Sequence, residues 1–236
     1  MSEGDLQAIY LTLKLASLTT LSLLVICVPC AYWLARSRHG VKPLIETLVT
    51  LPLVLPPTVI GYYFLVLFSP NQGLGLWLNE VLGVQLVFSF SGIFLASMIY
   101  SLPFTFRPLQ SAFEQLPTDL YQAGSLLGFS PVKQFFLILL PTIKPTLLTA
   151  ATLSFAHTIG EFGVILMIGG NIPGETQVVS LAIFDHVESL DLQAADSLAG
   201  LMLVFSFVTV FVCQWWQRQS TQMNELASTA LRGQCD

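Results

Sequence analysis

Several apolar runs in this chain reach about 20 residues, the length that a helix needs to cross a lipid bilayer. Charged residues make up only 10% of the sequence, whereas a soluble domain carries about 25%. Inside a bilayer the backbone must satisfy its own hydrogen bonds, so each run is expected to be helical. The sequence therefore predicts an all-α fold, a polytopic membrane helix bundle that forms a single transmembrane domain over residues 1–236.

Five transmembrane spans are expected, and a sixth segment lies between the third and the fourth. The spans cover about residues 8–34, 44–68, 86–106, 142–168 and 197–216. The intervening segment, residues 107–141, carries helix signals of its own. The first residues, MSEGDLQAIY, are acidic and polar rather than basic, so we expect no cleavable signal peptide and a first span that stays as an anchor.

The basic residues predict how the bundle is oriented in the membrane. If the N-terminus is outside, the inner segments and the inner end of span four hold every basic residue except Lys14, namely Arg36, Arg38, Lys42, Arg107, Lys133, Lys144, Arg218 and Arg232. Cytoplasmic segments are enriched in Lys and Arg. The distribution therefore predicts an outside N-terminus, a cytoplasmic C-terminus and a cytoplasmic 107–141 segment.

Residues 117–144, PTDLYQAGSLLGFSPVKQFFLILLPTIK, carry clear start and stop signals for two helices. Thr118 is a good N-cap, and Asp119 suits the positive end of the helix dipole in the first turn. Gly128 fits the left-handed conformation that ends many helices. Ser130 and Pro131 then suit the N-cap and first position of a second helix. We therefore expect a helix over 119–127, a glycine turn and a second helix.

This segment resembles the EAA motif of ATP-binding-cassette (ABC) importer permeases. The matching positions are Gln122, Ala123, Gly124, Gly128, Ile138, Leu140 and Pro141. Two of them depart from the pattern, because Gln122 replaces the usual Glu and Gly124 an Ala. The resemblance implies that the helix beginning at Asp119 is a coupling helix that docks on a cytoplasmic ATPase subunit. The alternative is an ordinary loop helix between two spans.

Three prolines interrupt the second span, in the run LPLVLPPTVIGYY. Each removes a backbone donor and clashes with the preceding helical turn. Broken backbone at membrane depth is tolerated only against protein or a water-filled cavity. The run is therefore predicted to be central and to help line a pathway, with candidate residues Pro52, Pro56, Pro57 and Gly61. The alternative is a kinked packing helix with no role in transport.

The fourth span carries two ionisable residues, His157 and Glu161, four positions apart and so on one face of a helix. Ionisable groups at membrane depth usually face the bundle interior or a pathway. Gly160 and Gly163 flank Glu161 and would allow close approach of another helix. All four are candidate pathway or gate residues. Alternatively, Glu161 braces the outer helix end with His157 as its partner.

No signal in the chain points to an enzyme, a metal site or a nucleic-acid partner. The three histidines lie on separate segments, so no metal-ligand cluster is expected, and no GxxxxGK[ST] phosphate loop is present. No tract of basic residues suggests nucleic-acid binding. Cys27 and Cys30 form a CVPC pair inside an apolar span, where they are expected to be small packing residues.

The strings LPLVLPPTVIGY, GEFG and GNIPGETQ, together with the EAA-like segment, resemble the molybdate permease family of ABC importers from Leu11 to about Trp216. His157 stands where some relatives have Arg. The resemblance implies a type I ABC importer permease fold and a pathway for molybdate or tungstate. It also implies a second copy of the chain in the bilayer, an external substrate-binding protein and two ATPase subunits. ATP and Mg would bind to the ATPase, with no cofactor in this chain.

Other transport classes and a non-transport role remain as alternatives. Sulfate and thiosulfate permeases carry a related Gly-Glu-Phe or Gly-Glu-Tyr stretch and are the nearest alternative. A secondary transporter would commonly show an inverted repeat and ionisable residues at mid-membrane, and the sequence shows no repeat. A scaffold role in a membrane complex is the third alternative. Co-purification of an ATPase would separate the ABC permease from the last two.

Overall fold

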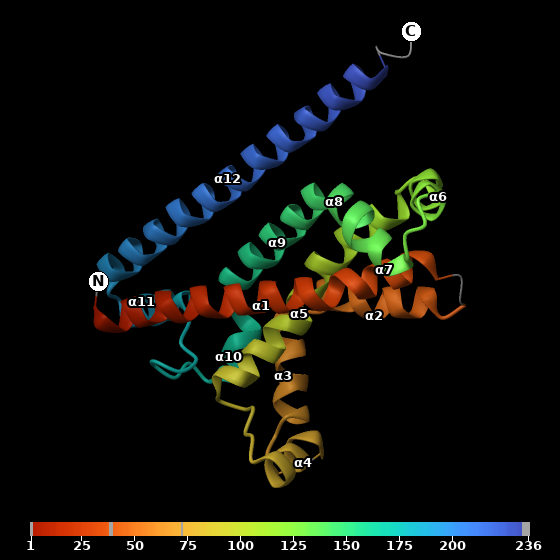
Figure 1. Cartoon of the computed structure of the whole chain (residues 1–236). Helices are drawn as coiled ribbons and strands as arrows, with labels where there is room; N and C mark the ends of the chain where they lie inside the picture. Colours follow the sequence, from red (N-terminus) through yellow and green to blue (C-terminus); the bar gives the residue numbers. More distant parts are fainter. Residues whose placement is uncertain (1, 38–39, 72, 233–236) are drawn as a thin grey trace.

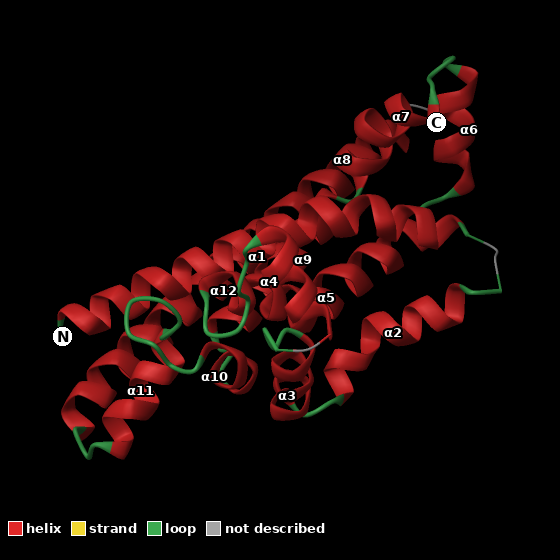
Figure 2. Cartoon of the chain, turned by 90° about the horizontal axis from the view of Figure 1, so that it is seen from below, coloured by secondary structure: helices red, strands yellow, loops and turns green. Residues whose placement is uncertain are grey.

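The computed structural model describes residues 2–37, 40–71 and 73–232 (Figure 1). Arg38 lies outside these residues, as do the side chains of Ala123, Arg218 and Arg232. Helices account for all the regular secondary structure in the described part of the chain, as Figure 2 shows. The predicted all-α class is therefore confirmed.

The chain forms long helices joined by shorter ones at its breaks and loops. In chain order, the elements are α1 (Glu3–Arg36), α2 (Lys42–Val54), α3 (Pro57–Leu67), α4 (Gly73–Leu82), α5 (Phe90–Glu114), α6 (Thr118–Leu126), α7 (Pro131–Gln134), the π-helical turn η1 (Phe135–Leu139), α8 (Leu140–Thr142), α9 (Lys144–Ile159), α10 (Gly163–Gly169), α11 (Val179–Glu188) and α12 (Leu192–Arg232).

Helices α1, α5 and α9 pack against one another and form the centre of the bundle. Leu23, Leu109 and Leu139 are almost fully buried in one half of it, and Cys27 is buried beside them. Cys30 is exposed, and both thiols are free. Helix α12 lies along one side of the bundle against α9 and α11 (Figure 1), and most apolar side chains of its Leu192–Trp216 part are exposed. Such an apolar outer face suits contact with lipid.

Two described helices are long and apolar enough to cross a membrane, α1 and the Leu192–Trp216 part of α12. Two bent pairs could each form a broken span. The first joins α2 to α3 at 112°, and the second joins Pro131–Thr142 to α9 at 72°. Helix α5 is not among these spans, and Ser97, Ser101 and Thr105 interrupt its apolar residues on the buried side. By length and apolar composition the described helices thus form up to four spans, and the count of five stays a prediction.

The helix boundaries differ from the expected spans in three places. Spans two and four are each broken, because Pro56 and Pro57 end α2 and because α9 ends at Ile159 before Gly160. The polar stretch after span two contains α4, and the long loop after span four contains α11. Helix α5 runs on to Glu114, so the first residues of the 107–141 segment continue the helix of the expected third span.

Candidate functional site

The segment between α5 and α9 folds as its sequence signals predict. Helix α6 begins at Thr118 and ends at Leu126, within one residue of the expected limits. Gly128 has a φ of 71°, in the left-handed region that favours glycine. The Ser130 hydroxyl accepts a hydrogen bond from the Lys133 amide at 3.3 Å, and Pro131 is the first residue of α7. The helix, glycine turn and second helix are therefore confirmed.

Gly124 lets α6 lie directly on the helical stretch that follows it. A Cβ atom at Gly124 would lie 2.8 Å from Gln134 Cγ and 3.1 Å from Ile138 Cδ1. Gln134 is itself held, because its Nε2 donates to Ser125 Oγ and to the Phe129 carbonyl, each at 3.2 Å. The glycine that departs from the EAA pattern therefore allows α6 to pack closely on α7 and η1.

The outer face of α6 makes little contact with the rest of the chain. Leu126 is 89% exposed and Leu127 is 68% exposed, and Asp119 and Gln122 are exposed as well. A groove with a volume of about 460 Å³ runs along Tyr121, Gln122, Ser125 and Leu126. Two exposed leucines beside a groove form a surface that suits a protein partner. Leu140 and Pro141 lie further on, in α8.

Aromatic contacts join α6 to the C-terminal end of α1. The Arg36 guanidinium lies 4.3 Å from the centre of the Tyr121 ring and donates to the Tyr32 hydroxyl at 3.3 Å. Tyr32 in turn packs on Phe113 of α5 and Phe135 of η1, with ring centres 5.3 and 5.0 Å apart. A displacement of α6 would therefore reach α1 and α5 through direct contacts.

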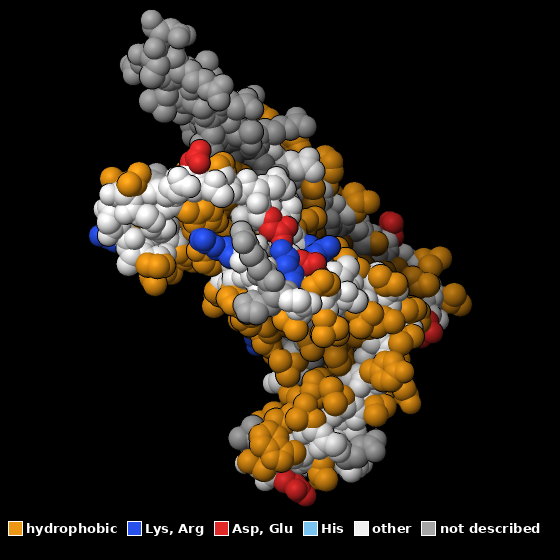
Figure 3. All heavy atoms as spheres, turned by 90° about the vertical axis from the view of Figure 1, so that its right-hand side faces the viewer, with side chains coloured by type: hydrophobic (Ala, Val, Ile, Leu, Met, Phe, Trp, Pro, Cys, Tyr) orange, Lys and Arg blue, Asp and Glu red, His pale blue; other side chains and the backbone are white. Residues whose placement is uncertain are grey.

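Charged and amide side chains join α2 to the C-terminal end of α5. Lys42 Nζ donates to Glu114 Oε1 at 2.7 Å, and the Gln110 amide donates to both Glu46 Oε1 and Glu114 Oε1. The hydrogen bond from Lys42 holds the pKa of Glu114 below its ordinary value, although partial burial opposes this. Figure 3 shows charged side chains gathered within the apolar surface of this end of the molecule.

The break between α2 and α3 forms an elbow at the surface of the chain. Helix α2 ends at Val54, which is 77% exposed, and α3 begins at Pro57. Pro52 is buried within α2, whereas Pro56 and Pro57 are exposed at the elbow. The predicted broken backbone is present. Its exposed side needs another protein surface or water at membrane depth, and the lining of a pathway stays a prediction.

Two glycines hold α3 close to α10. A Cβ atom at Gly61 would lie 2.7 Å from Met167 Cβ, and one at Gly163 would lie 3.0 Å from Pro57 Cβ. The close approach predicted at Gly163 is therefore present. At Gly160, by contrast, a Cβ would meet only its own helix, at 3.8 Å, so no other described helix approaches there. Gly160 instead ends α9, because it is the C-cap residue.

Glu161 lies in the break between α9 and α10, so the expectation of one helical face shared with His157 is wrong. The Ser97 hydroxyl donates to Glu161 Oε2 at 2.8 Å, and the Ser180 hydroxyl donates to the Glu161 carbonyl at 2.6 Å. Glu161 thus braces the break against α5 and α11. Its Oε1 atom is buried and has no partner among the described residues.

His157 contacts α5 rather than Glu161. Its Nδ1 lies 3.0 Å from Ser101 Oγ, and its ring stacks on Phe104 with centres 4.0 Å apart. No ion pair joins His157 to Glu161 in the described part of the chain. The two ionisable residues therefore make separate contacts with α5, His157 from α9 and Glu161 from the break that follows α9.

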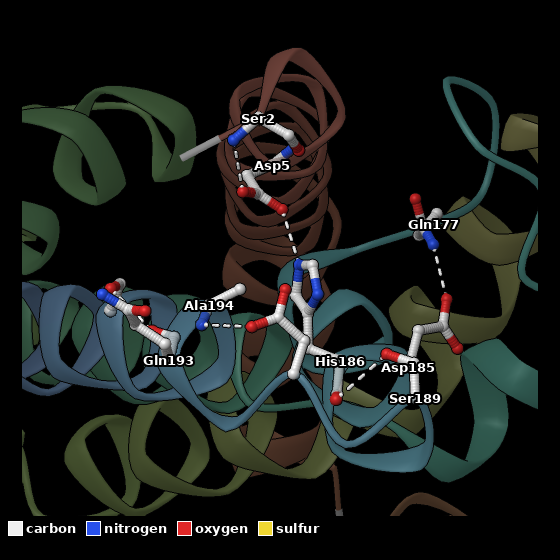
Figure 4. Close-up of polar contacts among 10 residues, drawn as sticks. Ser2, Asp5, Gln177, Asp185, His186, Ser189, Gln193 and Ala194 are labelled. Atoms are coloured by element: carbon white, nitrogen blue, oxygen red, sulfur yellow. Dashed lines mark hydrogen bonds and ion pairs between the residues drawn. The ribbon is translucent and has the colours of Figure 1, made fainter.

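At the opposite end from α6, polar contacts hold the start of α1 to α11 (Figure 4). His186 Nε2 lies 2.9 Å from Asp5 Oδ1, and Asp5 also caps the first turn with Ser2. The amides of Asn171 and Gln177 donate to Asp185 on the same helix. Sequence reasoning missed this cluster, because its members lie up to 181 positions apart.

The described residues hold no group of three or more His, Cys, Asp or Glu side chains placed to bind a metal ion. The site residues predicted from the sequence fall into two separate groups in the structure. The coupling set lies on α6 and the helices after it, and the pathway set lies at the elbow and at the α9–α10 break.

Comparisons with known proteins place this arrangement in context. Residues 12–222 match the family model described as binding-protein-dependent transport system inner membrane component. The chain is 51% identical over 212 residues to the molybdenum transport system permease protein ModB of Azotobacter vinelandii, which covers 89% of this chain and 93% of that one.

More distant relatives and solved structures agree on the fold. The sulfate transport system permease protein CysT of Escherichia coli strain K12 is 34% identical over 181 residues, covering 77% of this chain and 65% of that one. A bacterial alginate ABC transporter in complex with its alginate pentasaccharide-bound periplasmic protein has a chain that aligns with a TM-score of 0.79. That match has 18% identity and covers 94% of this chain and 81% of that chain.

Proposed function

The chain belongs to the family of binding-protein-dependent transport system inner membrane components, and from that premise we propose that it forms the pathway through which an ABC importer carries molybdate into the cytoplasm. As a member of this family, it is a multi-pass membrane permease subunit and not an enzyme. ATP hydrolysis belongs to a separate subunit. The proposal extends to tungstate, which is a tetrahedral dianion like molybdate.

One observation carries the choice of substrate. The chain is 51% identical, over 89% of its length, to a molybdenum permease, whereas its identity to the sulfate permease is 34% over a smaller share of both chains. Sulfate is the second candidate, because a sulfate permease is also similar to this chain and because sulfate, like molybdate, is a tetrahedral dianion. Identity across almost the whole chain supports the same pathway chemistry more strongly than a shared fold does.

The partners follow from the family and from two exposed surfaces. The outer face of α6, with Gln122 and Leu126, would dock on an ATPase subunit that binds ATP and Mg. The exposed elbow at Val54 to Pro57 would face a second copy of the chain across the pathway, because broken backbone cannot face lipid. A substrate-binding protein would deliver molybdate at the outer side.

The orientation is part of the same proposal. The helices α1 and α12 fit it, because the start of α1 and the far end of α12 lie on opposite sides of the molecule in Figure 1. With the N-terminus outside, α6 and the Lys42–Glu114 contact lie on the cytoplasmic side, where an ATPase would be. The Asp5–His186 contact then lies on the outer side, where the substrate-binding protein would dock.

The proposed mechanism is alternating access. Closure of the ATPase dimer on ATP would displace α6, and the packing of Gly124 on Gln134 and Ile138 would pass that displacement to η1 and α9. The contact of Arg36 with Tyr121 would pass it to α1. The α9–α10 break follows α9 directly, and the elbow packs on α10 where Gly163 meets Pro57, so both would move and open the pathway outward. Hydrolysis would then reset the complex.

Uptake in a strain that lacks the gene tests the substrate. Accumulated molybdenum and tungsten would be compared with labelled sulfate at low external concentration, with and without the gene restored. The proposal expects a defect confined to molybdenum and tungsten. A defect confined to sulfate would move the chain to the second candidate and leave the coupling mechanism intact. Normal uptake of all three anions would contradict the proposed transport of oxyanions.

A further inference from the structure

A groove on the cytoplasmic half of the chain is lined by a basic side chain, Arg107, that has no part in the proposed coupling mechanism. The groove lies between α2 and α5, has a volume of about 440 Å³ and is lined by Glu46, Thr47, Thr50, Val54 and Arg107, among others. Val54 is the last residue of α2, so the groove reaches the elbow. Its other end lies at Pro43, in the first turn of α2. The groove therefore connects the elbow to the cytoplasmic end of α2.

Arg107 differs from Lys42, the other cation of this region, in forming no hydrogen bond or ion pair within the described residues, although its charge attracts the Glu114 carboxylate at longer range. Lys42 Nζ lies 2.7 Å from Glu114 Oε1 and 3.9 Å from Glu46 Oε1. The Gln110 amide donates to the same two carboxylates. The Arg107 side chain is exposed and forms no ion pair within the described residues. Glu46 also lines the groove and would repel an anion, but Lys42 and Gln110 occupy its carboxylate.

The groove offers an anion one cationic contact and few other donors. The Thr47 hydroxyl donates to the Pro43 carbonyl at 2.8 Å, and the Thr50 hydroxyl donates to the Glu46 carbonyl at 2.7 Å. Both hydroxyl protons are therefore already used within α2. The guanidinium remains, and its planar set of five donors matches the edge of a tetrahedral oxyanion. One such contact in an open groove gives weak and transient binding, which suits a conducting pathway.

We propose that Arg107 is a binding contact for the transported tetrahedral dianion on its way from the elbow to the cytoplasm. This inference rests on the proposed function. It goes further by naming the side chain that receives the anion on the inner side of the pathway. The same guanidinium chemistry would also suit the phosphate of an anionic lipid, because Arg107 lies at the predicted inner end of the third span.

The test uses the permease reconstituted with its ATPase and binding protein in proteoliposomes. Uptake of labelled molybdate would be measured for the wild type, Arg107→Gln and Arg107→Lys, in phosphatidylcholine alone and with added phosphatidylglycerol. Lys144→Gln is the matched control, because Lys144 is also exposed, basic and at the cytoplasmic side of a predicted span but does not line the groove. ATP hydrolysis stimulated by the binding protein is measured in parallel.

Loss of the charge-assisted contact is expected to lower uptake by Arg107→Gln at least about tenfold in both lipid mixtures, with stimulated hydrolysis within about twofold of wild type. Arg107→Lys keeps part of the uptake, and Lys144→Gln keeps all of it. Unchanged uptake by Arg107→Gln, or loss of hydrolysis in step with uptake, would overturn the inference. A loss seen only with phosphatidylglycerol would assign the groove to lipid phosphate. Absence of molybdate uptake by the wild type would instead contradict the proposed function.

Discussion

The coupling segment and the membrane breaks both interrupt helices, yet they are held in different ways. In the coupling segment, Gly128 and Ser130 set the turn through their own backbone and side-chain preferences. At the breaks, Glu161 is held by Ser97, which lies 64 positions away, and Gly61 packs on Met167. Local sequence preferences thus determine the structure of the segment that would be displaced when the ATPase dimer closes. Contacts between distant helices fix the part that would gate the pathway.

The largest effect is expected from a substitution that disrupts a contact between distant helices, the packing of α3 on α10. Gly61→Leu would force a side chain into the space of Met167 Cβ and the Val164 backbone, at 2.7 and 3.3 Å. Such overpacking typically costs about 1–3 kcal/mol, and backbone atoms cannot yield as a flexible side chain does. We expect a lower midpoint of thermal unfolding in detergent, together with lost uptake.

Gly200→Leu is the control for that experiment, because nothing lies within 4 Å of the Cβ position of Gly200. This variant should unfold at or above the wild-type temperature, since glycine is unfavourable inside a helix. Equal unfolding temperatures for Gly61→Leu and the wild type would show that α3 does not pack on α10 as described.

The second prediction removes the partner of a buried carboxyl group. Ser97→Ala would leave both oxygens of the Glu161 side chain without a hydrogen bond, because Oε1 already has no described partner. An unsatisfied buried polar group costs about 1–3 kcal/mol. We expect a lower unfolding temperature and altered gating. Ser91→Ala, an exposed position on α5, is the control and should leave both unchanged.

If Ser97→Ala behaves like Ser91→Ala, the brace at the α9–α10 break contributes nothing measurable. The comparison between local and tertiary control would then rest on the α3–α10 contact alone.

The third prediction concerns the coupling segment, where α6 packs on the helical stretch that follows it. Gly124→Ala restores the residue of the EAA pattern, but its Cβ would meet the Gln134 side chain at 2.8 Å. Gln134 would have to move and give up its bonds to Ser125 and Phe129. Because the clash is with a flexible side chain, we expect a modest loss of about two- to fivefold in uptake per ATP hydrolysed.

The double variant Gly124→Ala with Gln134→Ala removes the clash and should recover part of that loss. Strictly additive losses in the double variant would show that Gly124 and Gln134 are not coupled, and that the glycine has some other role.

The smallest expected effect is a pH dependence at the α2–α5 contact. The hydrogen bond from Lys42 lowers the pKa of Glu114, so the contact stabilises the fold at pH values above the ordinary Glu pKa of about 4.3. This stabilisation is lost as the pH falls through the lowered pKa. Glu114→Gln should flatten the acid side of the unfolding-temperature profile slightly. An identical profile for the wild type and variant would contradict a native role for the ion pair.

The sequence predicted the helical class and the coupling segment well, because both depend on local signals. Apolar run length, the Gly128 turn and the Ser130 cap act within a few residues of one another. It also predicted a broken span at Pro56. It did not predict the end of α9 before Glu161 or the Ser97 partner, because these depend on which faces of α5 and α9 meet. The Asp5–His186 contact was missed for the same reason.

The measurement that tests the account most directly is uptake of molybdate per ATP hydrolysed by Gly128→Val in the reconstituted complex. A β-branched residue tolerates the left-handed conformation at φ 71° poorly, so the turn after α6 should distort. We predict that hydrolysis continues within about twofold of wild type while uptake falls at least about tenfold, with Gly40→Val, in another loop, as an unaffected control. Unchanged uptake per ATP in Gly128→Val would contradict coupling through this segment.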